Sequence, residues 1–305
     1  MVQASSRPQG DLDSILEGSQ LPALPQSAIR ILELSQDPEN GPAEFTVPIE
    51  SDPGLAGQVL RFVNSSYFGF SREVSSVRLA ITLVGVRTIK NFTLWSAVFS
   101  LMPNPKCGAL DLKLLWQDSL RRAVLARRTG LLAGLKEADD LFAAALLQDM
   151  AVPVLAKEFQ DDYATLFEAR QEGQTSLSVL EQERFGWTHA EAAARLATHW
   201  DLPGELIEPI RDHVEVERVF ADAQSPMSQR AVCLSSLLPA SVDPTWVECE
   251  KFATFYRQLR PAKGPTVVEL LEQVDTEFVD FAPVLQISTP GKSLVESYQE
   301  VAVAE

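Results

Sequence analysis

The apolar helical run from Leu141 to Phe159, "LFAAALLQDMAVPVLAKEF", contains one polar pair, Gln148–Asp149, that could do chemistry. An uncompensated carboxylate in apolar surroundings is costly, so Asp149 needs a partner. Three roles are therefore open for it. It could be a metal ligand, a remnant of a former metal site, or a structural carboxylate that has found a hydrogen bond.

Two further residues could join Asp149 in a site. Asp118 would make the site rich in carboxylates, as Mg²⁺ or Mn²⁺ prefers, but it could instead pair with Arg122, four residues later on the same helix. His189 follows a predicted helix cap at Thr188. The helix dipole there disfavours the charged imidazole and predicts a neutral one. A neutral imidazole suits a ligand, although a hydrogen-bonded packing histidine is the favoured interpretation.

The other two histidines give weaker signals. His213, in "RDHVE", has no second histidine beside it and is expected to be structural or exposed. His199 lies next to Trp200 near a predicted helix end, where the helix dipole stabilises a positive charge. Neither histidine by itself indicates catalysis.

The elements that must position these residues are all expected to be helices, because apolar residues recur at helical spacing and strand-like alternation is nearly absent. Asp52 is a predicted helix cap, and Thr188 with Glu191 forms a capping box. Pro48 should end or kink its helix, and Gly85 should separate two helices. Helices are predicted within residues 21–38, 43–51, 53–63, 74–84, 86–102, 110–128, 137–157, 161–171, 176–185, 188–200, 204–214 and 266–287.

The sequence predicts an all-α fold in consecutive parts. The run "MPNPKCG" at 102–108 is the best internal boundary, because it holds two prolines and a glycine in a short polar stretch. We expect a flexible tail or linker at 1–20, an N-terminal helical lobe at 21–105, a larger helical lobe at 106–240 and a C-terminal helical extension at 241–305.

Composition narrows the class of protein. A hydrophobic content of 46 % supports a folded core, and a net charge of −16 repels phosphate backbones and makes nucleic-acid binding unlikely. Cys107, Cys233 and Cys249 form no CxxC pair, which argues against a disulfide framework or a cysteine zinc site. With no apolar signal segment and no long apolar run, we expect a cytoplasmic protein that does not bind a membrane.

Seven segments follow one another along the chain: "LPALP" at 21–25, "SDPGLAGQVLRFVNSSYFG" at 51–69, "VSSVRLAITLVGVRTIKNF" at 74–92, "LWQDSL" at 115–120, "LLQDM" at 146–150, "THAEAAARLATHWDLP" at 188–203 and "IRDHVE" at 210–215. Their order resembles the HDOD family, the HD-related output domains of bacterial signalling proteins. The resemblance covers about residues 20–215.

The resemblance implies an HD-domain-like multi-helix fold with an additional N-terminal lobe, used as a regulatory output module. In catalytic HD enzymes, histidines and an adjacent His-Asp pair hold a divalent metal that activates water. Here Asp118 stands at the first histidine position, and Gln148–Asp149 stands at the pair, while Asp149, His189 and His213 survive. Since two imidazoles are missing, we expect a degenerate site without metal, cofactor or catalysis.

The leading hypothesis is thus a non-catalytic signalling module that binds an unidentified signalling protein. Candidate contact residues are Arg121 and Arg128, seven apart on one helix face, and Asn64 and Tyr67 in a polar turn that could line a groove between the lobes. Local ion pairs on a solvated face are the alternative for the arginines.

Two rival hypotheses remain. One is a residual metal-dependent phosphohydrolase or nucleotide-binding sensor that uses Asp118, Asp149 and His189. The other is a nucleic-acid-binding regulator that uses the helix pair around "GVRTIKN". It offers only Arg87 and Lys90 as cations.

Overall fold

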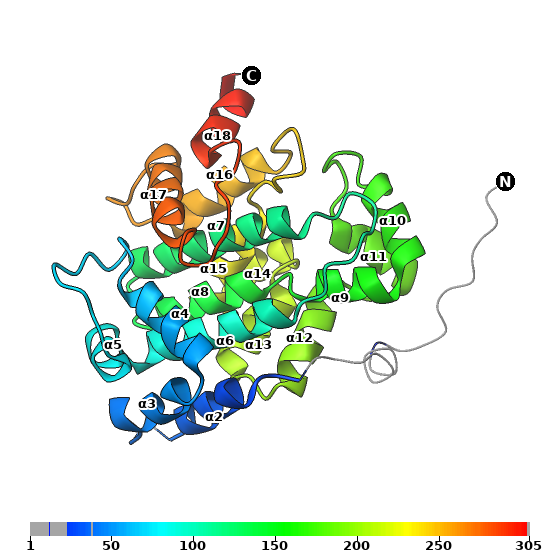
Figure 1. The fold of residues 1–305 in the computed structure, drawn as a ribbon. Helices are drawn as coiled ribbons and strands as arrows, with labels where there is room; N and C mark the ends of the chain where they lie inside the picture. Colours follow the sequence, from blue (N-terminus) through cyan, green and yellow to red (C-terminus); the bar gives the residue numbers. More distant parts are fainter. Residues whose placement is uncertain (1–11, 13–22, 38, 304–305) are drawn as a thin grey trace.

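The computed structural model describes residues 12, 23–37 and 39–303, and this part of the chain contains helices, turns and loops but no strand. The prediction of an all-α fold is confirmed. Most of the tail expected at 1–20 lies outside the described residues. In Figure 1 the blue helices α2 and α3 lie at one end of the molecule, red α18 lies at the opposite end, and α7 runs between them.

The N-terminal helices carry the capping residues expected of them. Asp52 accepts a hydrogen bond from the backbone of Leu55, Ser76 caps the next helix, and Gly85, at φ +90°, separates the last two helices of the lobe. These helices are α2 (Gln26–Ser35), α3 (Pro42–Glu50), α4 (Pro53–Val63), α5 (Val77–Val84) and α6 (Val86–Leu101).

The helix that contains Pro48 does not end at Pro48 itself. Pro48 is buried in the last turn of α3, which ends two residues later at Glu50. Pro48 has no N–H to donate to the carbonyl four residues earlier, and α3 ends within one turn of it.

The central helices surround the candidate site, and α7 packs along α8 and α15. They are α7 (Leu112–Leu132), α8 (Ala138–Leu147), α9 (Ala151–Glu158), α10 (Gln160–Ala169), α11 (Leu177–Phe185), α12 (His189–His199), α13 (Gly204–Asp212), α14 (Val216–Ala221) and α15 (Met227–Ser236). The capping box of Thr188 and Glu191 is present at the start of α12.

The single helix expected at 137–157 is in fact two helices. Residues 148–150 form a turn in which Met150 N–H donates to the Leu147 carbonyl at 3.0 Å and Val152 N–H donates to the Asp149 carbonyl at 3.0 Å. The apolar pattern continues through this turn, so it hid the break. The polar contacts of Gln148 and Asp149, described below, fix the turn.

The C-terminal helices pack back onto the centre of the molecule. They are α16 (Cys249–Leu259), α17 (Val267–Phe281) and α18 (Leu294–Val303). Helix α17 packs on α7 and α18. A contiguous hydrophobic cluster includes residues of all these parts, from Leu24 to Leu294, and the division of the chain into lobes remains a prediction.

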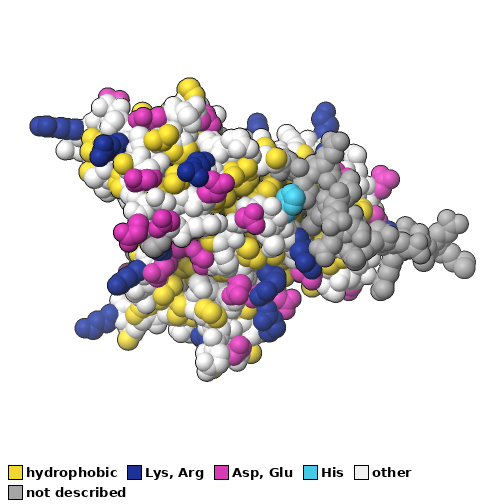
Figure 2. All heavy atoms as spheres, turned by 90° about the horizontal axis from the view of Figure 1, so that it is seen from below, with side chains coloured by type: hydrophobic (Ala, Val, Ile, Leu, Met, Phe, Trp, Pro, Cys, Tyr) yellow, Lys and Arg dark blue, Asp and Glu magenta, His cyan; other side chains and the backbone are white. Residues whose placement is uncertain are grey.

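No helix in the described residues is long and apolar enough to cross a membrane. On the face drawn in Figure 2, lysine and arginine side chains are scattered among acidic and hydrophobic ones and do not form a basic stripe. Cys107, Cys233 and Cys249 are buried, and none of the three is in a disulfide bond.

Candidate functional site

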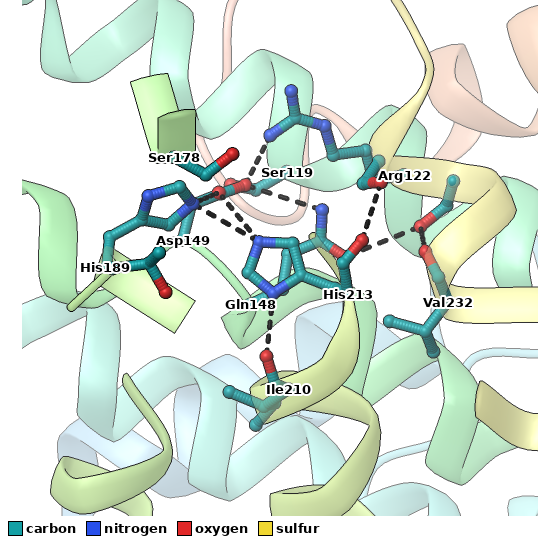
Figure 3. Close-up of polar contacts among 12 residues, drawn as sticks. Ser119, Arg122, Gln148, Asp149, Ser178, His189, Ile210, His213 and Val232 are labelled. Carbon is teal, nitrogen blue, oxygen red and sulfur yellow. Dashed lines mark hydrogen bonds and ion pairs between the residues drawn. The ribbon is translucent and has the colours of Figure 1, made fainter. Parts of the chain in front are cut away.

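The turn between α8 and α9 places Asp149 in a buried polar cluster (Figure 3). Its carboxylate forms an ion pair with the guanidinium of Arg122 on α7. Its Oδ1 lies 3.4 Å from His189 Nε2 and 3.6 Å from His213 Nε2. Burial opposes ionisation of Asp149, but Arg122, and then the two histidines, hold the pKa of its carboxyl well below the usual range.

His189 is the first residue of α12 and lies between two carboxylates. Its Nδ1 is 2.6 Å from Glu181 Oε2, and its backbone N–H donates to the same oxygen at 2.7 Å. Burial alone would lower the pKa of His189, but Glu181 and Asp149 outweigh it and raise the pKa to about 10. The expectation of a neutral imidazole is therefore wrong, because two adjacent carboxylates outweigh the helix dipole.

Glu181, on α11, was not singled out in the sequence. It is fully buried, and Tyr163 Oη donates to its Oε1 at 2.6 Å. Nothing in the sequence separates Glu181 from Glu183 two residues on. Only the packing of α10, α11 and α12 brings Tyr163 and His189 to it.

His213 is the C-cap residue that follows α13 and is 1 % exposed, which excludes the exposed alternative. Its Nδ1 lies 2.6 Å from the carbonyl oxygen of Ile210. With Nδ1 as the donor to that carbonyl, Nε2 faces His189 Nε2 at 3.3 Å. The backbone carbonyl thus orients the ring toward the cluster.

Asp118 and Gln148 both have protein partners. Asp118 accepts hydrogen bonds from the backbone N–H of Ser241 at 3.0 Å and from the Ser241 hydroxyl. The hydrogen bonds of Asp118 thus go to Ser241, and the ion pair of Arg122 is with Asp149, so the alternative of a direct Asp118–Arg122 ion pair is wrong. Burial raises the pKa of Asp118, against the opposing effect of Arg122.

Gln148 is fully buried, and its amide contacts Asp149 Oδ2 at 3.5 Å and the Ser235 hydroxyl at 3.4 Å. Both contacts are made by the neutral side-chain amide of Gln148. It completes the polar lining of the turn.

The residues present do not fit the metal that the fold family implies. Asp149, His189 and His213 do offer ligand atoms that all lie within 4.8 Å of one another. However, the carboxylate of Asp149 is already neutralised by the Arg122 guanidinium, and the Asp118 carboxylate is held by Ser241. A divalent cation beside a buried guanidinium would be repelled, and only two imidazoles remain.

A cavity of about 540 Å³ lies in front of this cluster. Asp118, Arg122 and Asp149 line it, together with Glu248 and Lys251 of the C-terminal part. Lys251 pairs with Glu217 at 2.6 Å and with Glu248 at 3.2 Å. Arg122 and Lys251, two cations in the wall of this cavity, are therefore both already paired.

The two arginines expected to face a partner are used within the chain. Arg121 is only 4 % exposed, donates to the Lys292 carbonyl and lies 5.8 Å from the Phe278 ring centroid. Arg128 is 2.5 Å from Glu277 on α17. The prediction that this face is free for an external partner is thus wrong, because the C-terminal extension covers it.

The turn of Asn64 and Tyr67 is also held by the chain. Asn64 donates to the Val74 carbonyl at 2.9 Å and accepts from the Val74 N–H at 2.7 Å. Tyr67 packs on Phe281, with ring centroids 4.0 Å apart. Asn64 therefore fixes a loop, whereas Tyr67 does line a cavity, which is described further below.

The two cations of the helix pair around "GVRTIKN" are not available to bind the phosphates of a nucleic acid. Arg87 pairs with Asp140 at 2.9 Å, and Lys90 is only 8 % exposed. One cation is thus neutralised, and the other is buried.

Comparison with known proteins shows the family. The model of the HDOD domain family matches residues 21–216, and the chain belongs to that family. A curated relative from Treponema pallidum (strain Nichols), named only as an uncharacterized protein, is 26 % identical over 199 residues. That match covers 63 % of this chain but only 37 % of the relative, so the chain spans little more than a third of its length.

Solved structures share the fold. A "Putative phosphohydrolase" from Shewanella amazonensis SB2B superposes with a TM-score of 0.70 at 19 % identity, over 91 % of this chain and 97 % of its own. A "Putative signal transduction protein" from Marinobacter aquaeolei VT8 gives 0.66 at 23 %, over 92 % and 61 %. An HDOD domain protein of unknown function from Geobacter sulfurreducens gives 0.61 at 21 %, over 96 % and 91 %.

Proposed function

We propose that this chain is a non-catalytic regulatory module of bacterial signal transduction that acts through protein–protein contacts. The observation that carries this proposal is the buried ion pair between Arg122 and Asp149. A metal-dependent hydrolase needs its carboxylate to face a cation that activates water. In this chain the guanidinium provides the positive charge, and a guanidinium cannot lower the pKa of a bound water as a metal does.

The proposal of protein contacts has separate support. One structural relative is named a signal transduction protein. In addition, four large apolar side chains of the N-terminal lobe are exposed: Val47 is 69 % exposed, and Phe70, Leu79 and Leu83 are between 39 % and 47 % exposed. Leu79 and Leu83 lie one turn apart on α5 and share a face. Exposed apolar side chains on one face are typical of an interaction surface.

A second candidate function is a residual metal-dependent phosphohydrolase. The observation that favours it is the cluster of Asp149, His189 and His213 beside a cavity large enough for a nucleotide. This candidate requires Arg122 to move away from Asp149.

One experiment separates the two. The purified protein is incubated with Mn²⁺, Mg²⁺ or Fe²⁺, its metal content is measured after desalting, and it is assayed with bis(p-nitrophenyl) phosphate and a cyclic dinucleotide. We expect far less than one equivalent of metal and no metal-dependent hydrolysis. Near-stoichiometric metal that is lost in Asp149→Ala, together with hydrolysis that is lost in His189→Ala, would establish the phosphohydrolase instead.

The contact surface is tested in cells that produce the protein naturally. A photo-crosslinking amino acid is placed at Leu79 or Phe70, with Val179 on α11, which is 48 % exposed, as the matched control. We expect a cross-linked protein at the first two positions and none at Val179. Equal cross-linking at all three positions, or none at any, would contradict a contact surface on the N-terminal lobe.

A further inference from the structure

A second cavity, of about 280 Å³, lies where the N-terminal lobe, the central helices and the C-terminal extension meet. Its wall takes Phe62 from α4, Phe92 and Trp95 from α6, Phe142 from α8 and Phe281 from the end of α17. The cavity is separate from the cluster around Asp149, and the two linings share no residue.

The wall is a packed set of aromatic rings. Phe62 and Phe92 are stacked, with centroids 4.2 Å apart and planes 6° from parallel. Phe142 and Tyr67 lie 5.2 and 4.0 Å from Phe281, centroid to centroid. Flat rings that are already ordered favour a flat aromatic guest, because stacking costs them little additional entropy.

The charges at the cavity compensate one another. Arg127 Nε donates to Asp139 Oδ1 at 2.8 Å, and Thr88 donates to Asp139 Oδ2 at 2.9 Å. The Arg127 guanidinium also lies 5.2 Å from the centroid of the Tyr67 ring. Since the cation and the carboxylate are paired, the cavity favours a guest without net charge.

Two residues of the lining carry buried polar atoms without a partner. The Asn91 amide nitrogen donates to the Asp139 carbonyl and to Asp140, but Asn91 Oδ1 has no hydrogen-bond partner, and neither has Trp95 Nε1. Asn91 and Trp95 are 5 % and 6 % exposed. A buried donor or acceptor left unpaired is unfavourable, so a guest that pairs with it stabilises the complex.

We propose that this cavity binds an uncharged, planar aromatic small molecule of about two fused rings that carries a carbonyl acceptor. The size follows from the volume, which lies just below the range for small-molecule sites, about 300–1,000 Å³. The rings stack on the aromatic wall, and the carbonyl accepts from Trp95 Nε1. This site does not depend on the proposed function, since it uses none of the residues around Asp149.

The test uses prodan, an uncharged naphthalene that carries a carbonyl and emits at shorter wavelength in apolar surroundings. Prodan is titrated with the full chain and then displaced by 2-acetylnaphthalene or 2-ethylnaphthalene, which have nearly the same shape and differ in the carbonyl. We expect one equivalent of prodan to bind. The acetyl compound should displace it at about 3- to 10-fold lower concentration, the ratio that one hydrogen bond provides.

Matched variants locate the site. Trp95→Phe should abolish the preference for the acetyl compound, whereas Trp116→Phe, whose ring stacks on Phe99 outside the cavity, should preserve it. Leu83 lies at the lining and is 47 % exposed, so Leu83→Trp is expected to fold and to weaken prodan binding severalfold by narrowing the cavity. Leu79→Trp, one turn earlier on α5, is its control.

Several results would overturn the proposal. They are no saturable prodan binding, equal displacement by both naphthalenes, or an unchanged preference in Trp95→Phe. Tighter binding of the anion 2-naphthoate than of 2-acetylnaphthalene would contradict an uncharged guest. Prodan binding that is identical in Leu83→Trp and Leu79→Trp, both folded by circular dichroism, would place the probe elsewhere.

Discussion

The guanidinium of Arg122 and the carboxylate of Asp149 form an ion pair between side chains that are only 12 % and 9 % exposed. The pair joins α7 to the turn between α8 and α9. Removing one partner of a buried pair leaves an uncompensated charge, which is more costly than the pair itself.

Arg122→Ala should therefore lower the free energy of unfolding by about 3–5 kcal/mol. Chemical denaturation measures this. The matched control is Arg30→Ala, because Arg30 forms an exposed i,i+3 pair with Glu33 and should change stability by no more than about 1 kcal/mol. Similar losses in both variants would show that the Arg122 pair has no special role.

His189 should make stability fall as the pH rises. Its pKa is raised from 6.5 to about 10 in the folded chain, so between these values only the folded state holds the proton. The stabilisation that His189 contributes is thus present in full below pH 6.5. Above that pH the free energy of unfolding decreases by at most about 1.4 kcal/mol per pH unit, up to about pH 10. The groups that face His189 are Glu181, Asp149 and His213.

Denaturation midpoints between pH 6.5 and 9.5 test this pH dependence. His189→Gln should be less stable and should show a shallower slope, whereas His199→Gln, at an exposed position, should keep the slope of the parent. Parallel slopes for all three proteins would refute the assignment to His189.

Tyr163→Phe should destabilise the chain by about 1–3 kcal/mol, because Glu181 Oε1 then loses its donor inside the core. Tyr256→Phe removes a hydrogen bond to a neutral acceptor, the Pro265 carbonyl, and is expected to cost less. Thermal and chemical unfolding measure the loss of stability in both variants. A larger loss in Tyr256→Phe than in Tyr163→Phe would contradict this prediction.

Arg128→Ala should loosen α17, because Arg128 bonds both Glu277 and Gln273 on that helix. Hydrogen exchange across Val267–Phe281 should become roughly 10- to 150-fold faster, since a charged hydrogen bond contributes about 1.5–3 kcal/mol. Exchange in α2 and α3 should stay at the parent rate. Uniformly faster exchange would indicate global destabilisation rather than release of α17.

A metal site should form only when the guanidinium is removed. We expect Arg122→Ser combined with Gln148→His to bind Mn²⁺ or Fe²⁺ more tightly than Gln148→His alone, because the single variant still places Arg122 beside Asp149. Calorimetric titration of both variants and of the parent measures this. Equal affinity of the two variants would mean that Arg122 does not block the cation.

Much of the fold could be predicted from the sequence because its signals are local. The caps at Asp52 and Thr188 and the break at Gly85 depend on nearby residues, and the structure has them in place. The turn at 148–150 could not be predicted, because the apolar pattern runs through it and its cause lies in partners on α7 and α12.

The candidate site was predictable only in part, for the same physical reason. The sequence indicated Asp149 and His189, but their charge states depend on Arg122 and Glu181, which tertiary packing brings near. The sequence likewise predicts that Arg121 is an exposed cation on α7, whereas its contact with α17, distant in sequence, buries it.

The pairing of Arg122 with Asp149 also limits the routes by which this chain could change over generations. Replacing either partner alone strands a charge in the core, and placing histidine at Gln148 alone leaves the guanidinium where a cation would bind. A lineage that carries this pair must therefore alter several positions nearly together to gain a metal centre. The ion pair therefore tends to be retained, since each single substitution of a partner reduces stability before any new chemistry can be selected.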